Sequence, residues 1–169
     1  MSTTQAPPDT DRRVAIDFLY LDISSCSRCQ GTGDNLELAL VAVERLLRDT
    51  GAEVTVRRTQ VQSLQQAREL RFEVSPTLRV NGRDIEPIAR ESPCGPDACG
   101  CGEGGSCRVW SYDGQDSDEA PVALIVDAIL AALSDGQPAA GADAPAYVAP
   151  NSIVRAFARP ARNGRGCCG

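Results

Sequence analysis

The pattern of apolar and polar positions predicts a succession of short strands and helices. Residues 14–23, VAIDFLYLDI, are rich in β-branched and aromatic side chains with partial alternation, as expected of a buried strand. From about Asp34 to Arg48, apolar residues recur every three or four positions and mark one face of a helix. This helix ends at Gly51 and starts either at Asp34 or earlier, near Cys29.

The following segments continue this alternation. Residues 54–58 predict a second strand, and residues 63–70 a short helix. Asn81-Gly82 is a strong signal for a type I′ turn between two short strands. Residues 108–112 predict another strand, and residues 121–133 a helix that is apolar on most faces and opens with a proline. This order favours an α/β layer with a parallel strand pair and an antiparallel hairpin.

Composition predicts one folded domain with tails. We expect a disordered leader at 1–12, a domain at 13–133, a flexible linker at 134–150 and a basic tail at 151–169 that ends in Cys-Cys-Gly. The linker is rich in Ala, Gly and Pro and has too little apolar surface to order itself. Residues 153–157, IVRAF, form either a short amphipathic element that docks the tail on the domain or a partly ordered turn.

Charge and length narrow the classes of function. A net charge of -6 and the absence of lysine disfavour nucleic-acid binding, which relies on clustered basic side chains. No apolar run approaches the roughly 18 to 20 residues needed to cross a bilayer, and the first residues lack the apolar segment of a secretory signal. We therefore expect a cytoplasmic protein that binds neither nucleic acid nor membranes.

The chain has eight cysteines and no histidine. In a reducing compartment, so many cysteines are more often metal-binding, redox-active or catalytic than structural. The lack of histidine excludes a Cys-His catalytic dyad and every mixed Cys/His zinc site. Any site for a soft metal must therefore be built from thiolates.

The most informative motif is Cys26-Ser27-Arg28-Cys29, which follows the first predicted strand and precedes the helix. Two thiols at this spacing can close a disulfide or bind one soft ion, and amides at a helix start stabilise a thiolate. Arg28 can add to that stabilisation. The alternatives are half of a structural four-cysteine zinc site or a chance pair.

A proline interrupts the apolar segment EVSPTLRVNG. Pro76 within a strand indicates either a cis peptide bond beside a binding site or an edge strand. In thioredoxin-like folds a cis proline lies against the CxxC pair, and this segment resembles that one. The combination makes Cys26, Cys29 and Pro76 the candidate catalytic residues.

Four more cysteines share one Gly-rich segment: Cys94, Cys99, Cys101 and Cys107. Their intervals of five, two and six residues match no standard zinc ribbon. Four roles remain possible for these cysteines: an all-Cys zinc site, an iron-sulfur cluster, disulfide bridges that pass electrons to the CxxC pair, or thiols that pair with each other in a surface loop.

The chain ends in Cys167-Cys168-Gly169 on a basic tail. Adjacent cysteines form a mutual disulfide poorly, but their thiolates can together trap Hg(II) or As(III). A flexible linker would carry this pair across the domain at high effective concentration, as a delivery arm. The ending resembles the Cys-Cys arm of mercuric reductases and does not match a CaaX lipidation box, and an incidental tail is the alternative.

The segments CSRCQGTG, SPTLRVNGRDIEP, CGPDACG, SCRVWSYDG and PVALIVDAIL resemble, over about residues 14–133, a bacterial and archaeal thioredoxin-like family labelled as a domain of unknown function. Some relatives carry the automatic label alkylmercury lyase. The resemblance implies a thioredoxin-like α/β fold with a mixed central sheet and flanking helices, with Cys26 and Cys29 as the CxxC pair and Pro76 as the cis proline. The family's later cysteines are matched in outline by Cys94, Cys99 and Cys107. Cys101 and the terminal pair are additions.

Three functions follow as hypotheses. In a thiol-disulfide oxidoreductase or thiol carrier, Cys26 attacks a disulfide or metal thiolate of a partner and Cys29 resolves it. In a non-catalytic buffer or chaperone, the eight cysteines hold arsenic, mercury, copper(I) or zinc, so that a thiolate-bound Zn, Hg or As ion is the only cofactor considered. An organomercurial lyase would need a proton donor near the thiols, for which Asp22 and Asp34 are the candidates.

Overall fold

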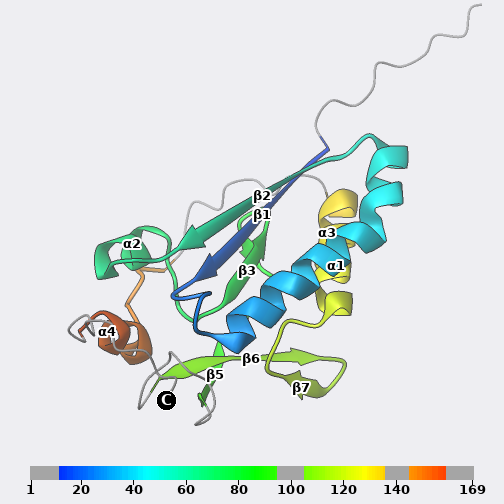
Figure 1. Cartoon of the computed structure of the whole chain (residues 1–169). Helices are drawn as coiled ribbons and strands as arrows, with labels where there is room; N and C mark the ends of the chain where they lie inside the picture. Colours follow the sequence, from blue (N-terminus) through cyan, green and yellow to red (C-terminus); the bar gives the residue numbers. More distant parts are fainter. Residues whose placement is uncertain (1–11, 95–104, 136–144, 159–169) are drawn as a thin grey trace, which may run out of the picture.

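The computed structural model describes residues 12–94, 105–135 and 145–158. The elements in chain order are β1 (Arg13–Tyr20), α1 (Ser27–Thr50), β2 (Glu53–Gln60), α2 (Leu64–Glu69), β3 (Thr77–Val80), β4 (Arg83–Asp84), β5 (Arg90–Pro93), β6 (Ser106–Tyr112), β7 (Gln115–Ser117), α3 (Val122–Asp135) and α4 (Asn151–Ala158). Helices flank a mixed sheet, which confirms the predicted α/β class (Figure 1).

The central sheet has four strands in the order β2-β1-β3-β4. β1 and β2 are parallel and connected through α1, whereas β3 pairs with β1 and β4 in antiparallel fashion. The β3–β4 turn has φ angles of 49° at Asn81 and 78° at Gly82, as a type I′ turn requires. The predicted parallel pair and hairpin are therefore both present.

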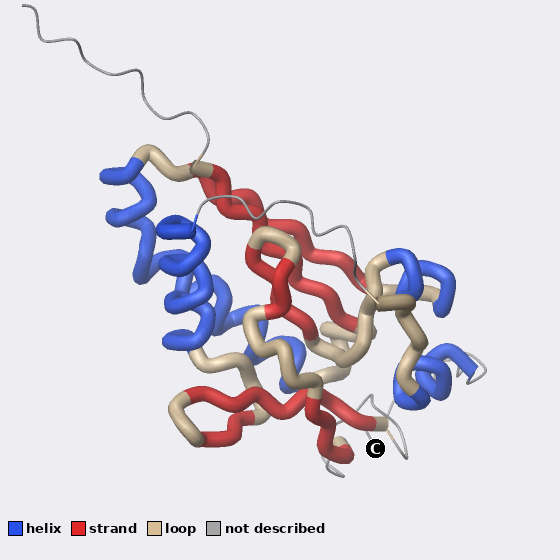
Figure 2. The backbone as a smooth tube through the Cα atoms, turned by 180° about the vertical axis from the view of Figure 1, so that it is seen from behind, coloured by secondary structure: helices blue, strands red, loops and turns tan. Residues whose placement is uncertain are grey.

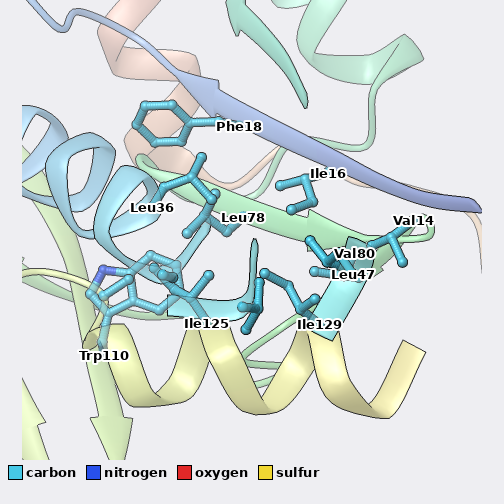
Figure 3. Close-up of a cluster of buried hydrophobic side chains, with 13 residues drawn as sticks. Val14, Ile16, Phe18, Leu36, Leu47, Leu78, Val80, Trp110, Ile125 and Ile129 are labelled. Atoms are coloured by element: carbon cyan, nitrogen blue, oxygen red, sulfur yellow. The ribbon is translucent and has the colours of Figure 1, made fainter. Parts of the chain in front are cut away.

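The main core lies between this sheet and the helices α1 and α3. Alternate residues of β1, Val14, Ile16 and Phe18, point toward the helices and are at most 1% exposed. Ile125 and Ile129 of α3 meet them from the other side (Figure 3). Burial of each such side chain stabilises the folded state by about 1.5–3 kcal/mol. The contacts of β1 with the helices therefore fix α1 and α3 on one face of the sheet.

Helix α1 begins at the CxxC motif. Cys26 is its N-cap, so the earlier of the two predicted starts is correct. Gly51 ends the helix with a left-handed φ of 67°, and its N–H donates to the carbonyl of Arg48. Strand β1 ends at Tyr20, before the predicted residue 23, because Asp22 accepts hydrogen bonds from Ser24 and bends the chain. Among the described residues, no helix combines the length and apolar character needed to cross a bilayer.

A second core lies on the opposite side of the sheet, under α2 and α4 (Figure 2). Leu19 points to this side because side chains alternate along β1, and it packs with Phe72 and Ile153. Ile153 of α4 is 1% exposed. The hydroxyl of Tyr147 also donates to the carbonyl of Phe72, which brings part of the predicted linker against the domain. Of the two alternatives for residues 153–157, the docked amphipathic element is present.

A second sheet, β5-β6-β7, lies beside the start of α1 (Figure 1). The sequence predicted only part of β6 and missed β5 and β7, because RESP and QDS lack apolar alternation. Asp113 and Gly114, with φ angles of 51° and 74°, form the tight β6–β7 turn. The pairing with β6, rather than local apolar pattern, therefore defines these strands.

The two sheets are joined by Arg108 of β6, whose side chain is 0% exposed. Its guanidinium donates to both carboxylate oxygens of Asp84, each at 2.9 Å, and lies 4.2 Å from the centre of the Trp110 ring. Its backbone N–H donates to the carbonyl of Ser75 at 2.8 Å. The strand that carries Cys107 is thereby fixed to the β3–β4 hairpin.

Replacement of Arg108 by Met should lower the free energy of unfolding by about 3 kcal/mol, because Asp84 loses a buried charge partner. Urea denaturation followed by circular dichroism measures the effect. Arg90→Met is the matched control, because Arg90 pairs with Asp116 at the surface. Its loss should lower the free energy of unfolding by less than about 1 kcal/mol. Equal losses in the two variants would contradict a special role for the buried pair.

Candidate functional site

Cys26 and Cys29 lie at the first turn of α1, with side chains that are 5% and 1% exposed. The Sγ of Cys26 accepts a hydrogen bond from the backbone N–H of Cys29 at 3.3 Å. This N-capping contact and the positive end of the helix dipole both stabilise negative charge on the Cys26 sulfur. Cys26 is therefore the better placed of the two to act as a nucleophile.

The turn that leads into Cys26 is organised by Asp22. Its carboxylate accepts from the backbone N–H of Ser24 at 2.8 Å and from the hydroxyls of Ser24 and Ser25. Burial opposes ionisation, but the hydrogen bonds from Ser24 and Ser25 outweigh it and lower the pKa of Asp22. The ionised carboxylate is a poor proton donor, and the other candidate, Asp34, lies exposed on α1.

The Ser75–Pro76 segment lies against the CxxC pair. The peptide bond between the two residues is cis, and Pro76 is buried. Ser75 Oγ is 3.7 Å from Cys29 Sγ and accepts from the backbone N–H of Leu21 at 3.1 Å. The structure thus brings the segment of Pro76 to Cys29. Ser75 was not predicted as a site residue, although its position before that proline was the available signal.

Cys107 and Cys94 reach the same place from the second sheet. Cys107 Sγ lies 3.6 Å from Cys26 Sγ and 3.0 Å from Cys94 Sγ. Cys26, Cys29 and Cys107 form one buried cluster, and Cys94 packs against it half-buried. Four of the predicted cysteines therefore come together in space.

The other predicted cysteines, Cys99, Cys101, Cys167 and Cys168, lie outside the described residues. Within residues 12–94, 105–135 and 145–158, no group of three or more His, Cys, Asp or Glu side chains is arranged to hold a metal ion. The described thiols are close in pairs, which suits sulfur exchange or an ion held by two thiolates.

Arg28, between the two cysteines of the motif, binds the second sheet. It donates to Ser92 Oγ at 2.7 Å and forms an ion pair with Asp118 at 2.9 Å. The sequence suggested that its charge would support the thiolate, but the guanidinium is directed to these two oxygens. Its role in the structure is to hold β5 beside the start of α1.

A cavity of about 270 Å³ opens at the thiols. Its lining includes Cys26, Cys29, Cys107 and Ser75, together with Ile153, Arg155 and Phe157 of α4. Asp22 and Glu91 add negative charge to its wall. Sequence analysis missed the contribution of α4, which depends on Ile153 reaching a core built from distant segments.

A family model described as Domain of unknown function (DUF2703) matches residues 14–129. No curated protein and no solved structure matches the chain.

Asp22→Asn should lower the free energy of unfolding at pH 7 by about 1 kcal/mol, because the amide replaces an anionic hydrogen-bond acceptor in a partly screened turn. The folded pKa of Asp22 lies below its ordinary 3.8, so its contribution is complete above that pH and is lost as the pH falls through the folded pKa. Urea unfolding between pH 7 and 3 should therefore show a shrinking difference between variant and wild type. Asp34→Asn is the exposed control, and a difference that grows toward low pH would contradict the assignment.

Ile153→Asp should release α4 from the domain, because an unpaired carboxylate in the core under α2 is strongly unfavourable. Brief trypsin digestion followed by mass spectrometry should show cleavage after Arg155 increased by roughly tenfold or more, since cleavage requires local opening. Val154→Asp, at a position 38% exposed on the same helix, should leave the rate close to wild type. Equal cleavage in both variants would argue against docking through Ile153.

Proposed function

We propose that this chain, which belongs to the family described as Domain of unknown function (DUF2703), is a thioredoxin-like protein that carries out thiol-disulfide exchange through Cys26 and Cys29. The observation that carries the proposal is the Cys26 thiol at the N-cap of α1, bonded to the N–H of Cys29 and open to a cavity. A cytoplasmic location suits a dithiol that must be available in reduced form.

The thioredoxin-like assignment is supported by the arrangement of elements around the motif. A parallel β1-α1-β2 unit is followed by the antiparallel strands β3 and β4, and α3 packs beside α1. The CxxC pair begins α1, and the cis Ser75–Pro76 bond directly precedes β3. Contact between Cys29 and Ser75 brings these two segments together at one end of the sheet.

In the proposed exchange, the Cys26 thiolate attacks one sulfur of a substrate disulfide and forms a mixed disulfide. The second substrate sulfur leaves as a thiolate and takes a proton from solvent. Cys29 then loses its proton and attacks Cys26 Sγ, which closes the Cys26–Cys29 disulfide and releases the substrate sulfur that Cys26 had attacked, as a thiol. An external thiol reductant restores the pair for the next cycle.

Capture of thiophilic ions such as Hg(II) or As(III) is the second candidate function. It is favoured by the 3.6 Å approach of Cys26 and Cys107, which presents two soft donors to the cavity. A buffer or chaperone would need only this binding, without turnover. The ionised carboxylate of Asp22 gives no support to the organomercurial lyase alternative, which needs a proton donor.

The terminal Cys167–Cys168 pair suits delivery of such a cargo. Helix α4 forms a wall of the cavity and ends at Ala158, and Cys167 follows nine residues later in the sequence. An extended chain of that length spans at most about 30 Å, so covalent geometry allows the pair to reach the cavity. We assign the pair as a delivery arm within this proposal.

Cys26→Ser should abolish catalysed reduction of insulin by dithiothreitol, because the attacking sulfur is removed. Cys29→Ser should instead leave Cys26 in a disulfide with the substrate or with Cys107, visible by mass spectrometry, because the resolving thiol is missing. Cys101→Ser is the control with no role in this exchange and should retain full activity.

Binding of Hg(II) and As(III) to the same variants separates the two functions. If Cys26→Ser loses insulin reduction but retains part of the metal binding, exchange is supported. If the wild type binds these ions at fixed stoichiometry and never reduces insulin, a buffer or chaperone is supported instead. Full reductase activity in Cys26→Ser would contradict the proposed exchange.

A further inference from the structure

The second sheet supplies two thiols that the exchange described above does not use. Cys107 lies on β6, and Cys94 directly follows β5. Antiparallel pairing places Ser92 opposite Cys107, and the N–H of Cys94 donates to the carbonyl of Gly105 at 3.0 Å. The two cysteines are thus held diagonally across a two-stranded ladder, where long side chains meet.

The sulfur atoms form a continuous series from Cys94 through Cys107 to Cys26. The two separations are 3.0 Å and 3.6 Å. A disulfide needs about 2.05 Å, so the sulfurs of Cys94 and Cys107 must approach by only about 1 Å to bond. The longer separation is close to the roughly 3–3.5 Å of reacting atoms held in near-attack geometry. Cys107 is therefore placed to exchange with a sulfur on either side.

Cys94 is the most exposed of the four thiols. Cys94 is half-buried, whereas Cys107 is 3%, Cys26 5% and Cys29 1% exposed. Cys94 also does not line the cavity that contains the other three thiols. A molecule from solvent can therefore react with Cys94 without entering the cavity, and Cys107 is the sulfur that links it to Cys26.

The start of α1 and β5 are held together by Arg28. Its hydrogen bond to Ser92 connects the residue between the two motif cysteines to the strand that precedes Cys94, and its ion pair with Asp118 connects it to the end of β7. Arg108, next to Cys107, fixes β6 through its backbone bond to Ser75. Two independent contacts thus hold the second thiol pair beside the first.

We propose, on the basis of the function proposed above, that Cys94 and Cys107 are a second redox pair that exchanges its disulfide with Cys26 and Cys29. The Cys94 thiolate attacks a low-molecular-weight disulfide, which forms a mixed disulfide at Cys94 and releases one thiol. Deprotonated Cys107 then attacks Cys94 Sγ, which forms the Cys94–Cys107 bond and releases the second thiol. The Cys26 thiolate then attacks Cys107 Sγ, so that the Cys26–Cys107 bond forms, the Cys94–Cys107 bond breaks and Cys94 leaves as a thiolate that is protonated by solvent. Deprotonated Cys29 attacks Cys26, forms the Cys26–Cys29 disulfide and returns the Cys107 thiol.

This transfer is balanced within the chain. Two electrons and two protons move from Cys26 and Cys29 to Cys94 and Cys107, and the only external reactant is the disulfide that oxidised the second pair. Every step is an exchange between sulfurs and is reversible. A low-molecular-weight thiol acting on an oxidised Cys94–Cys107 pair would drive the same series in the other direction, toward reduction of Cys26 and Cys29.

The test uses the full chain with Cys99, Cys101, Cys167 and Cys168 replaced by Ser, so that only the four thiols of the series remain. The reduced protein is mixed with oxidised glutathione, quenched with N-ethylmaleimide at intervals, digested and mapped by mass spectrometry. A Cys94–Cys107 bond should form first and a Cys26–Cys29 bond later. Cys29→Ser should accumulate the Cys26–Cys107 bond, because the last step is blocked.

Cys94→Ser should slow formation of the Cys26–Cys29 bond about tenfold, because the intramolecular route has a high effective concentration of the attacking thiol. Circular dichroism and thermal unfolding verify that each variant is folded. If the Cys26–Cys29 bond forms at the parent rate in Cys94→Ser and Cys107→Ser, the proposed role of the second pair is overturned and the proposed exchange stands. If no disulfide ever forms between Cys26 and Cys29 in the parent, both proposals fail.

Discussion

The buried guanidinium of Arg108 is the constraint on which the site depends. A charge removed from water is stable only with a well-placed partner, and Asp84 provides one with both carboxylate oxygens at 2.9 Å. This pairing holds β6 against the β3–β4 hairpin, and the ring of Trp110 lies beside the guanidinium. The same contacts place Cys107, the residue before Arg108, beside Cys26.

The parts of the fold that sequence predicts are those set by local pattern. β1 and α3 bury apolar side chains at regular intervals, and Asn81-Gly82 has the backbone freedom that its turn needs. The strands β5 and β7 escape prediction because they form by pairing with β6 rather than by burying their own apolar residues. Asp113-Gly114 is a turn signal of the same kind as Asn81-Gly82. The residues that follow it are polar, so the sequence does not predict a second strand there.

The residues of the site also differ in whether local sequence or tertiary contacts place them. Cys26 and Cys29 are neighbours in sequence, so a helix start brings them together without help from the rest of the chain. Cys94 meets Cys107 only through the register of β5 on β6, which no spacing of cysteines encodes. Helix α4 becomes part of the cavity because Ile153 reaches a cluster assembled from Leu19 and Phe72, a contact between distant segments.

The contacts of Arg28 have a consequence for how this chain can change. A basic residue next to a thiol can lower its pKa when the charge faces the sulfur. Here its guanidinium is an anchor for Ser92 and Asp118. A mutation at this position therefore loosens the second sheet from the start of α1, and the identity of this residue is set by packing rather than by the chemistry of the sulfurs beside it.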